Sequence, residues 1–264
     1  MEIPSRHLGL SLDEDFCFEE FADRVAELVE KHVNINRLLE LTKPVATAVV
    51  PISAGRHTYK REPSFPIAVA CDPAFNFVYE ANIRYLHHLG EVTYFSPLAD
   101  TSLPDAGFVY LPGGYPELYL AALSANRQML QSIRRYVESG GKLLAECGGM
   151  MYLCDEIRDK NGYVYPMAGV LHQSATMENM KLRLGYRTLL YNETRLKGHE
   201  FHYSRLVEQQ NPLPSCAVAY TAKGVETDTP LYHYKNVWAG YTHLYWADPV
   251  GNEWFTKFVI DGNT

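Results

Sequence analysis

A cysteine followed by two glycines ends a short apolar run near the middle of this 264-residue chain. The run KLLAE (142–146) predicts a buried strand, and Cys147-Gly148-Gly149 then leads into the apolar stretch MMYL. A tight strand-to-helix turn of this kind resembles the nucleophile elbow of G-x-S-x-G enzymes, although the first glycine is absent here. A helix N-terminus favours the thiolate of such a cysteine. The pattern therefore predicts Cys147 as a nucleophile, with a buried structural cysteine as the alternative.

A second glycine pair follows the preceding predicted strand, in LPGGYPELY (111–119). Gly113 and Gly114 can leave a backbone N–H free beside the cysteine turn, and Gly148 can supply another. Two such donors form an oxyanion hole for a carbonyl under attack. The alternative is an ordinary turn between a strand and a helix. Tyr115 is expected to line the same pocket.

A cysteine nucleophile needs a base, and two settings among the histidines are notable. His243 in WAGYTHLYWADP ends a predicted strand and can reach Cys147 if that strand joins the same sheet. His199 and His202 in GHEFHYS have a spacing that would suit a metal on a helix, but the flanking aromatic residues favour an extended segment. Glu200 and His202 are therefore interpreted as pocket residues, and no metal site is expected.

Composition narrows the class of protein. The formal net charge is −7 and no Lys/Arg-rich block occurs, so neither nucleic acid nor an anionic membrane is an expected partner. No apolar run approaches the ~20 residues of a membrane-spanning helix, and the N-terminus lacks a signal peptide. The five cysteines are scattered, which indicates free thiols and a cytoplasmic protein.

Strand and helix patterns alternate from Pro66 onward. Predicted strands at 67–72, 91–97, 107–114 and 142–146 alternate with helical patterns at 75–89 and 116–139. This order indicates an α/β fold with a doubly wound, mostly parallel sheet. Shorter strands after residue 160 are expected as antiparallel additions to the same sheet, and NEWFTKFVI as a final helix.

The N-terminal part has a different pattern. A helix is predicted over 14–31, and Asn34 is expected to cap a second short helix, INRLLELTK. Two helices with apolar faces make too small a core alone, so this part is expected to pack on something else. Residues 1–43 thus form one region, 44–65 a linker and 66–264 the main domain.

The motifs LPGGYPELY, AECGGMMYL, GHEFHYS and GYTHLYW, in this order, resemble the glutamine amidotransferase domain of the cobyrinic acid a,c-diamide synthases. The resemblance covers about residues 66–264. It implies a class I, triad-type amidotransferase with a flavodoxin-like fold. Residues 1–43 then resemble the helical end of that family's N-terminal synthetase domain, which suggests a truncated or split form of a longer protein.

The resemblance also implies a reaction and its participants. Cys147 would attack the carboxamide of L-glutamine, and His243 would act as its base. Gly113, Gly114 and Gly148 would stabilise the oxyanion. The ammonia would amidate the a- and c-carboxylates of a corrinoid in the synthetase domain, where ATP and Mg²⁺ are expected. This chain itself needs no cofactor and is expected either as a homodimer or paired with a synthetase chain.

Two positions depart from the wider class of triad amidotransferases. Met151 stands where many members have Gln, and Tyr245 stands where many have the Glu that orients the histidine. Asp248 and Glu200 remain as candidates for the third triad member. Two other functions stay open: a non-catalytic module that binds a corrinoid or docks a partner, and an amidotransferase for a related tetrapyrrole such as hydrogenobyrinate.

Overall fold

The computed structural model describes residues 5–6, 9–10, 18–42 and 65–261. They belong to two units, residues 1–59 and residues 60–264. The linker predicted at 44–65 lies almost wholly outside the described residues, as do the ends of the chain. Among the helices that are described, none is both long enough and apolar enough to cross a membrane.

The first unit contains two short strands and two helices. These elements are β1 (Ser5–Arg6), β2 (Gly9–Leu10), α1 (Phe18–His32) and α2 (Ile35–Leu41). The side chain of Asn34 accepts a hydrogen bond from the backbone N–H of Arg37 at 2.9 Å, so the predicted helix cap is confirmed. Large apolar side chains of both helices are exposed, among them Val25, Leu28, Val29, Leu38, Leu39 and Leu41.

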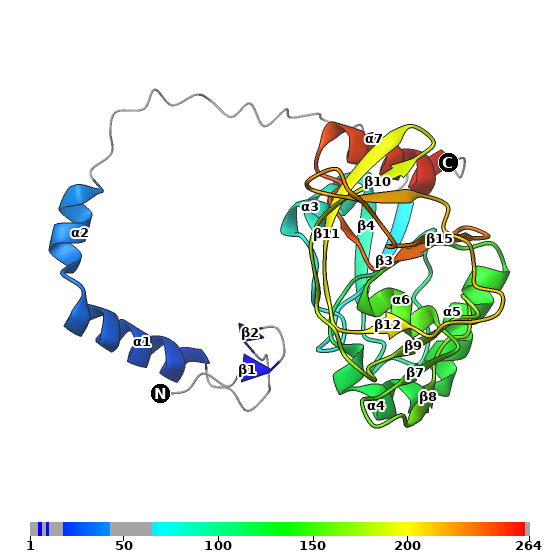
Figure 1. Cartoon of the computed structure of the whole chain (residues 1–264), viewed down its shortest axis with the longest axis horizontal. Coiled ribbons are helices and arrows are strands. Elements are labelled where there is room, and N and C mark those ends of the chain that lie inside the picture. The colour runs from blue at the N-terminus through cyan, green and yellow to red at the C-terminus, as the bar shows by residue number, and fades with distance from the viewer. Residues whose placement is uncertain (1–4, 7–8, 11–17, 43–64, 262–264) are drawn as a thin grey trace. The chain divides into compact units, whose positions relative to one another are not determined.

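A six-stranded sheet forms the centre of the second unit (Figure 1). Its strands are β3 (Phe65–Ala70), β4 (Gly90–Phe95), β5 (Phe108–Leu111), β6 (Lys142–Glu146), β15 (Leu231–Tyr234) and β16 (Val237–Gly240). The order is β15-β16-β6-β5-β3-β4, and every neighbouring pair except β15 with β16 is parallel. The predicted parallel sheet is thus confirmed.

Both faces of this sheet are buried under helices. Val109 and Leu111 of β5 join one core cluster, while Phe108 and Tyr110 of the same strand join the other, because alternate side chains point to opposite faces. The first cluster includes residues of α4 (Leu120–Ala125), α5 (Arg127–Glu138) and α6 (Gly148–Leu153). The second includes residues of α3 (Glu80–Leu89), α7 (Pro249–Thr256) and the π-helical segment Lys257–Asp261. The fold is therefore doubly wound, as predicted.

The later strands do not simply extend this sheet, which corrects one expectation. A second sheet has the order β14-β13-β10-β11-β17, and a third the order β12-β9-β7-β8. The second sheet contains β10 (Arg183–Tyr191), β11 (Thr194–His202), β13 (Val218–Thr221), β14 (Glu226–Thr227) and β17 (His243–Leu244). The third contains β7 (Glu156–Arg158), β8 (Val164–Pro166), β9 (Ser174–Thr176) and β12 (Arg205–Leu206). Strand patterns identify strands but not their partners, and β15 is the one antiparallel addition to the central sheet among the described strands.

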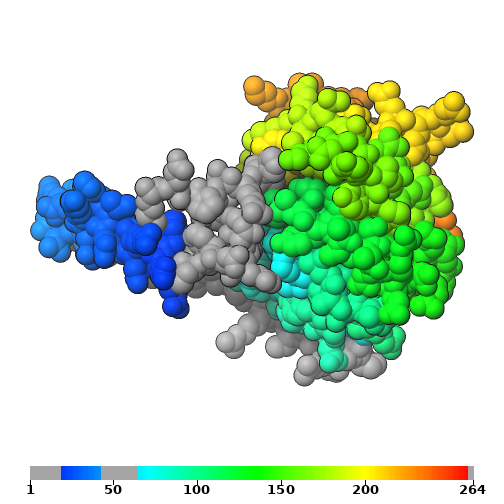
Figure 2. Space-filling model, turned by 90° about the horizontal axis from the view of Figure 1, so that it is seen from below, coloured from blue at the N-terminus to red at the C-terminus, as the bar shows by residue number. Residues whose placement is uncertain are grey.

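In Figure 2 the segments coloured green and those coloured yellow to orange occupy adjoining parts of the face that is shown.

The hairpin of β10 and β11 has a two-residue turn. Asn192 and Glu193 both have positive φ, 43° and 67°, as in a type I′ turn. Tyr191 pairs with Thr194 beside the turn, and the pairing continues without a break to Arg183 and His202. The turn therefore fixes which residues of β11 face each side of the sheet.

Two predicted helices differ in their bounds. The helix predicted from residue 75 begins at Glu80, because Phe77 instead donates a backbone hydrogen bond to the Gly113 carbonyl at 3.0 Å. The region 116–139 is divided into a 3₁₀ turn, Pro116–Leu118, and the helices α4 and α5. The break falls at Asn126, whose side chain caps α5 by accepting from the Met129 N–H at 3.3 Å.

Candidate active site

Cys147 occupies the turn between β6 and α6 that the sequence predicts. Its φ is 48° and its ψ −107°, a conformation that costs free energy for a non-glycine residue. The Cys147 N–H donates to the Gly240 carbonyl of β16 at 2.8 Å, which fixes the turn to the neighbouring strand. The next residue, Gly148, begins the helix. Cys147 therefore lies in a strained turn that is fixed by the hydrogen bond to β16 and by the start of α6.

The resting charge of Cys147 differs from the expectation. Burial raises the pKa of the Cys147 thiol well above its usual range, and the nearby Glu117 carboxylate raises it further. A hydrogen bond from the Gly148 N–H lowers the pKa, but by less. Since α6 is only six residues long, its terminus does not outweigh burial. Burial therefore favours the protonated thiol form of Cys147.

The two glycine turns lie against each other. A Cβ atom on Gly148 would stand 3.2 Å from the Gly114 backbone nitrogen and 2.7 Å from Pro116 Cδ. A Cβ on Gly149 would stand 2.1 Å from the carbonyl oxygen of Leu111. Only glycine permits these approaches. The Gly114 backbone nitrogen therefore lies close to Gly148, the residue that follows Cys147.

His243 lies at the same edge of the sheet, although it belongs to β17 of the second sheet. The chain runs from β16, the parallel neighbour of β6, directly to β17, where His243 pairs with His199 of β11. The imidazole of His243 stacks on that of His199, with centroids 4.9 Å apart, and meets the ring of Phe77 edge-on at 4.7 Å. A Cβ on Gly113 would stand 2.1 Å from His243 Cε1. The ring is therefore confined on several sides.

Burial determines the charge of His243. Only 3% of the residue is exposed, and desolvation, helped by the positive charges of His199 and His202, lowers the pKa of His243 to about 3. The imidazole is neutral near pH 7. A neutral imidazole can accept a proton.

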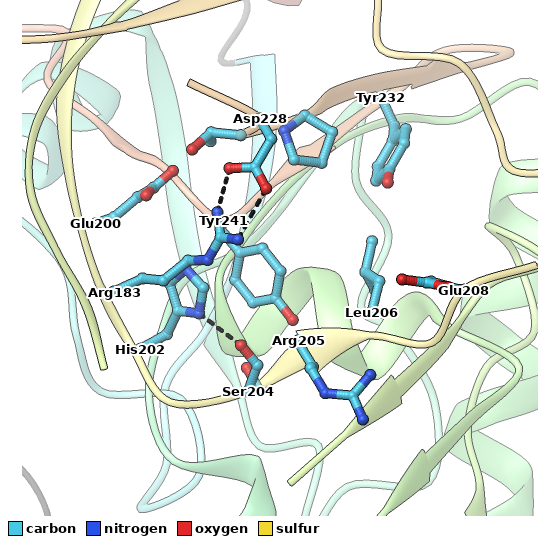
Figure 3. Close-up of a pocket in the computed structure, with 12 residues that line it drawn as sticks. Arg183, Glu200, His202, Ser204, Arg205, Leu206, Glu208, Asp228, Tyr232 and Tyr241 are labelled. Atoms are coloured by element: carbon cyan, nitrogen blue, oxygen red, sulfur yellow. Dashed lines mark hydrogen bonds and ion pairs between the residues drawn. The ribbon is translucent and has the colours of Figure 1, made fainter. Parts of the chain in front are cut away.

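Glu200 and His202 line a cavity of about 310 Å³ beside this site (Figure 3). The His202 ring stacks on Tyr241, with centroids 3.8 Å apart. Arg183 forms a two-point ion pair with Asp228 on the wall of the cavity. Glu200 is fully buried and pairs with Arg187 at 2.8 Å. Glu200 and His202 thus line a cavity whose wall carries charges of both signs.

The cavity is connected to the cysteine turn through Ser204. Its hydroxyl donates to the sulfur of Met151 at 3.2 Å, and the Met151 N–H donates to the Cys147 carbonyl at 3.0 Å. Met151 therefore holds the loop after β11 where the wider class has Gln.

The remaining predicted residues are placed as follows. Tyr115 lies near Cys147, and its pKa is raised by burial and, to a smaller extent, by Glu117. It does not line the cavity of Glu200. Tyr245 is 38% exposed and packs edge-on against Tyr79. Asp248 caps α7 by accepting from the Gly251 N–H at 2.7 Å. Nowhere in the described ranges do three or more His, Cys, Asp or Glu side chains gather as metal ligands would.

Sequence reasoning missed Glu146 and Tyr110. Glu146 is the last residue of β6 and only 1% exposed, and the Tyr110 hydroxyl donates to its Oε2 at 2.6 Å. Its Oε1 accepts from the Leu244 N–H at 3.0 Å. The available signal was the acid itself, because a glutamate that ends a buried strand is uncommon unless it has specific partners.

The fold and site define an α/β protein with a cysteine elbow, and comparison with known families gives its class. Residues 66–250 match the family described as the CobB/CobQ-like glutamine amidotransferase domain. The chain belongs to this family and is a glutamine amidotransferase domain. The sequence-based resemblance is thereby confirmed.

The most similar relatives found among curated proteins include a,c-diamide synthases. The chain is 36% identical over 257 residues to hydrogenobyrinate a,c-diamide synthase of Stutzerimonas stutzeri, covering 95% of this chain and 56% of that protein. It is 38% identical to the protein of that name in Pseudomonas aeruginosa, covering 92% and 54%. It is 34% identical to cobyrinate a,c-diamide synthase of Leptospira interrogans, covering 92% and 56%. The chain thus spans about half the length of these relatives.

Solved structures give a weaker likeness. A chain in the structure of PurLQS from Thermotoga maritima has a TM-score of 0.49 and 17% identity, covering 75% of this chain and 96% of that one. A crystal structure described as a glutamine amidotransferase has a TM-score of 0.49 and 17% identity, covering 73% and 98%.

Proposed function

We propose that this domain hydrolyses L-glutamine with Cys147 as the nucleophile and His243 as the general base. The observation that carries the proposal is the meeting of four elements at one sheet edge. These are the strained Cys147 turn, the Gly113-Gly114 turn, the N-terminus of α6 and the buried, neutral His243. Together they supply the three requirements of acyl transfer from an amide: a nucleophile, oxyanion donors and a base.

The reaction follows from this arrangement. The Cys147 thiol gives its proton to His243 as the sulfur bonds to the side-chain carbonyl carbon of glutamine. The carbonyl electron pair moves to oxygen, where the N–H groups of Gly114 and Gly148 stabilise the negative charge. The intermediate collapses, the C–N bond breaks, and His243 returns the proton to the leaving nitrogen, which departs as ammonia. Water, deprotonated by His243, then cleaves the γ-glutamyl thioester.

The ammonia is proposed to serve an ATP-dependent amidation. The relatives are named for a,c-diamide formation on cobyrinate or hydrogenobyrinate, and this chain matches about half of their length. We assign the a- and c-carboxylates of one of these corrinoids as acceptors, in a synthetase part that uses ATP and Mg²⁺. The synthetase part belongs either to the same polypeptide or to a partner chain, and we place the assembly in the cytoplasm.

A glutaminase assay tests the proposal. Cys147→Ser is expected to reduce glutamine hydrolysis by about 10³-fold or more, because the hydroxyl is a much weaker nucleophile at this site. Cys216→Ser is the matched control, since this half-buried thiol bonds to the Leu231 carbonyl. It should retain the wild-type rate. Equal activity in the wild-type and Cys147→Ser proteins would refute the assignment.

A covalent assay gives the same answer when turnover is slow. An electrophilic chloroketone analogue of glutamine should add one label to the wild-type protein, on Cys147, and none to Cys147→Ser. Labelling that is spread over the four described cysteines, or absent altogether, would count against the proposal.

A further inference from the structure

His243 lacks the partner that a catalytic base requires. Its Nδ1 is buried and has no hydrogen-bond partner within the described structure. A histidine that takes a proton on one ring nitrogen must carry its own proton on the other, and an acceptor normally fixes that tautomer. The two candidates for this role are engaged elsewhere, because Asp248 caps α7 and Glu200 pairs with Arg187. Tyr245, which stands where the wider class has Glu, packs on Tyr79.

One carboxylate does face His243. The Oε2 atom of Glu146 is 4.0 Å from His243 Nδ1, and both side chains are almost completely buried. Among the described residues, no Lys or Arg side chain pairs with Glu146. At 4.0 Å the carboxyl group and the neutral imidazole are close neighbours but do not yet form a hydrogen bond. Catalytic contacts of this kind are often long in an empty site and shorten in the complex.

Glu146 is held in place from three strands. It belongs to β6, its Oε2 accepts from Tyr110 of β5, and its Oε1 accepts from the N–H of Leu244 in β17. Leu244 is the residue directly after His243. The carboxylate therefore binds the backbone that carries the histidine and also faces its ring. Because Glu146 directly precedes Cys147, one short segment presents the nucleophile and reaches the base.

We propose that Glu146 is the positioning residue of His243 and takes the role of the third member of the triad. This inference rests on the proposed glutaminase function. The Glu146 carboxylate accepts the Nδ1 proton of His243, which leaves Nε2 as the nitrogen that takes the proton of Cys147. When that proton arrives, the imidazolium gains a negative charge beside it. The proton passes on from Nε2 to the leaving nitrogen, and Glu146 itself transfers none.

The charges at the site make this arrangement responsive to pH. Burial raises the pKa of Glu146 to about 8. The groups that face Glu146 are Tyr110 from β5, Tyr79 before α3, Cys147 after β6 and His243 from β17. Of these, His243 is the one that becomes cationic during the reaction. Activity should therefore rise as the pH approaches 8 and Glu146 becomes a carboxylate.

Kinetics with two substitutions test the role. Glu146→Gln keeps the size of the side chain but not its charge, and it can hold the wrong histidine tautomer. We expect kcat to fall about 10²–10⁴-fold with KM changed less than about threefold. Glu146→Asp restores a carboxylate and should recover at least tenfold of the loss. Glu138→Gln, at an exposed carboxylate paired with Lys235, is the control and should behave like the wild type.

The pH profile separates positioning from a structural role. The rise of kcat toward pH 8 should be present in the wild type and in Glu146→Asp but absent in Glu146→Gln. A Glu146→Gln protein with the wild-type kcat, or with the wild-type pH profile at a uniformly lower rate, would overturn the proposal.

Nitrogen NMR of the wild-type protein tests the inference without any kinetic assay. In ¹⁵N-histidine-labelled protein at pH 8, with His243→Asn used to assign the signals, His243 should carry its proton on Nδ1. A proton on Nε2 would overturn the proposal even if Glu146→Gln failed to fold. Absence of glutaminase activity in the wild type, with the Nδ1 proton observed, would instead count against the proposed function alone.

Discussion

Two glutamates in this domain are equally buried but differ in their partners. Glu200 is 0% exposed and has a full cation, Arg187, at 2.8 Å, and a hydroxyl donor, Thr242, at 3.3 Å. Glu146 is 1% exposed and has two neutral donors, Tyr110 and the backbone of Leu244. A carboxylate that is already paired with a cation interacts less with a new positive charge nearby. One that lacks a permanent cation can respond when a neighbouring histidine takes up a proton.

The largest expected effect on stability comes from breaking the buried ion pair between Arg187 and Glu200. Arg187→Met should lower the free energy of unfolding by about 3–5 kcal/mol, because it leaves the Glu200 charge buried without a partner. Chemical denaturation at pH 7 measures this. The double variant Arg187→Met/Glu200→Leu should recover most of the loss, since both charges are then gone. A loss below about 1 kcal/mol in the single variant would mean that the pair is not the fixed structural element described here.

A second effect concerns the pH dependence of stability. The pKa of Glu146 is about 8 in the folded protein against an ordinary value of 4.5, so between these values the folded state holds more protons than the unfolded state. Its contribution to stability is present below about pH 4.5 and is lost as the pH rises through 8. Wild-type protein should therefore lose stability relative to Glu146→Gln over this range, on the order of a few kcal/mol.

Denaturation curves of both proteins at several pH values measure that difference. The opposite contribution from His243, whose pKa is lowered to about 3, rises with pH below 6.5. The comparison is therefore made between pH 6.5 and 8, where the His243 contribution no longer changes in either protein. A difference between the two proteins that stays constant over this range would contradict the raised pKa of Glu146.

The smallest effect is expected at Thr242. Thr242→Val removes the 3.3 Å hydrogen bond to Glu200 and leaves the Arg187 contact in place. The free energy of unfolding should fall by about 0.5–1.5 kcal/mol, the usual net value of one hydrogen bond. Thermal unfolding followed by circular dichroism is sufficient. A loss as large as that of Arg187→Met would show that the hydroxyl, and not the guanidinium, fixes Glu200.

The sequence predicted the parts of this site that are local. A strand, a cysteine and two glycines define the Cys147 turn, and the same reasoning located Gly113 and Gly114. Whether His243 reaches this turn depends on β16 pairing with β6 and on β17 pairing with β11, which are contacts between residues far apart in the chain. Periodicity does not specify such pairings. The sequence favoured a thiolate at Cys147, whereas burial favours the thiol. The reason is related, because a helix terminus can be predicted from sequence but the depth of burial cannot.

Glu146 is a second example of a residue whose contacts the sequence does not predict. It stands inside the motif that indicated the nucleophile, but an acid before a cysteine has no obvious role until the fold brings His243 opposite. The break at Asn126 was different, since asparagine is a common helix cap and the signal was available.

The turn at Asn192 and Glu193 has a consequence for how this domain can change over time. His199 stacks on His243, while Glu200 and His202 line the cavity, so adjacent residues of β11 lie on opposite faces of the strand. Inserting or deleting a single residue in that turn would exchange the two sides, placing a carboxylate where an imidazole now stacks. Lineages of this domain should therefore tolerate many substitutions along the hairpin but conserve its length.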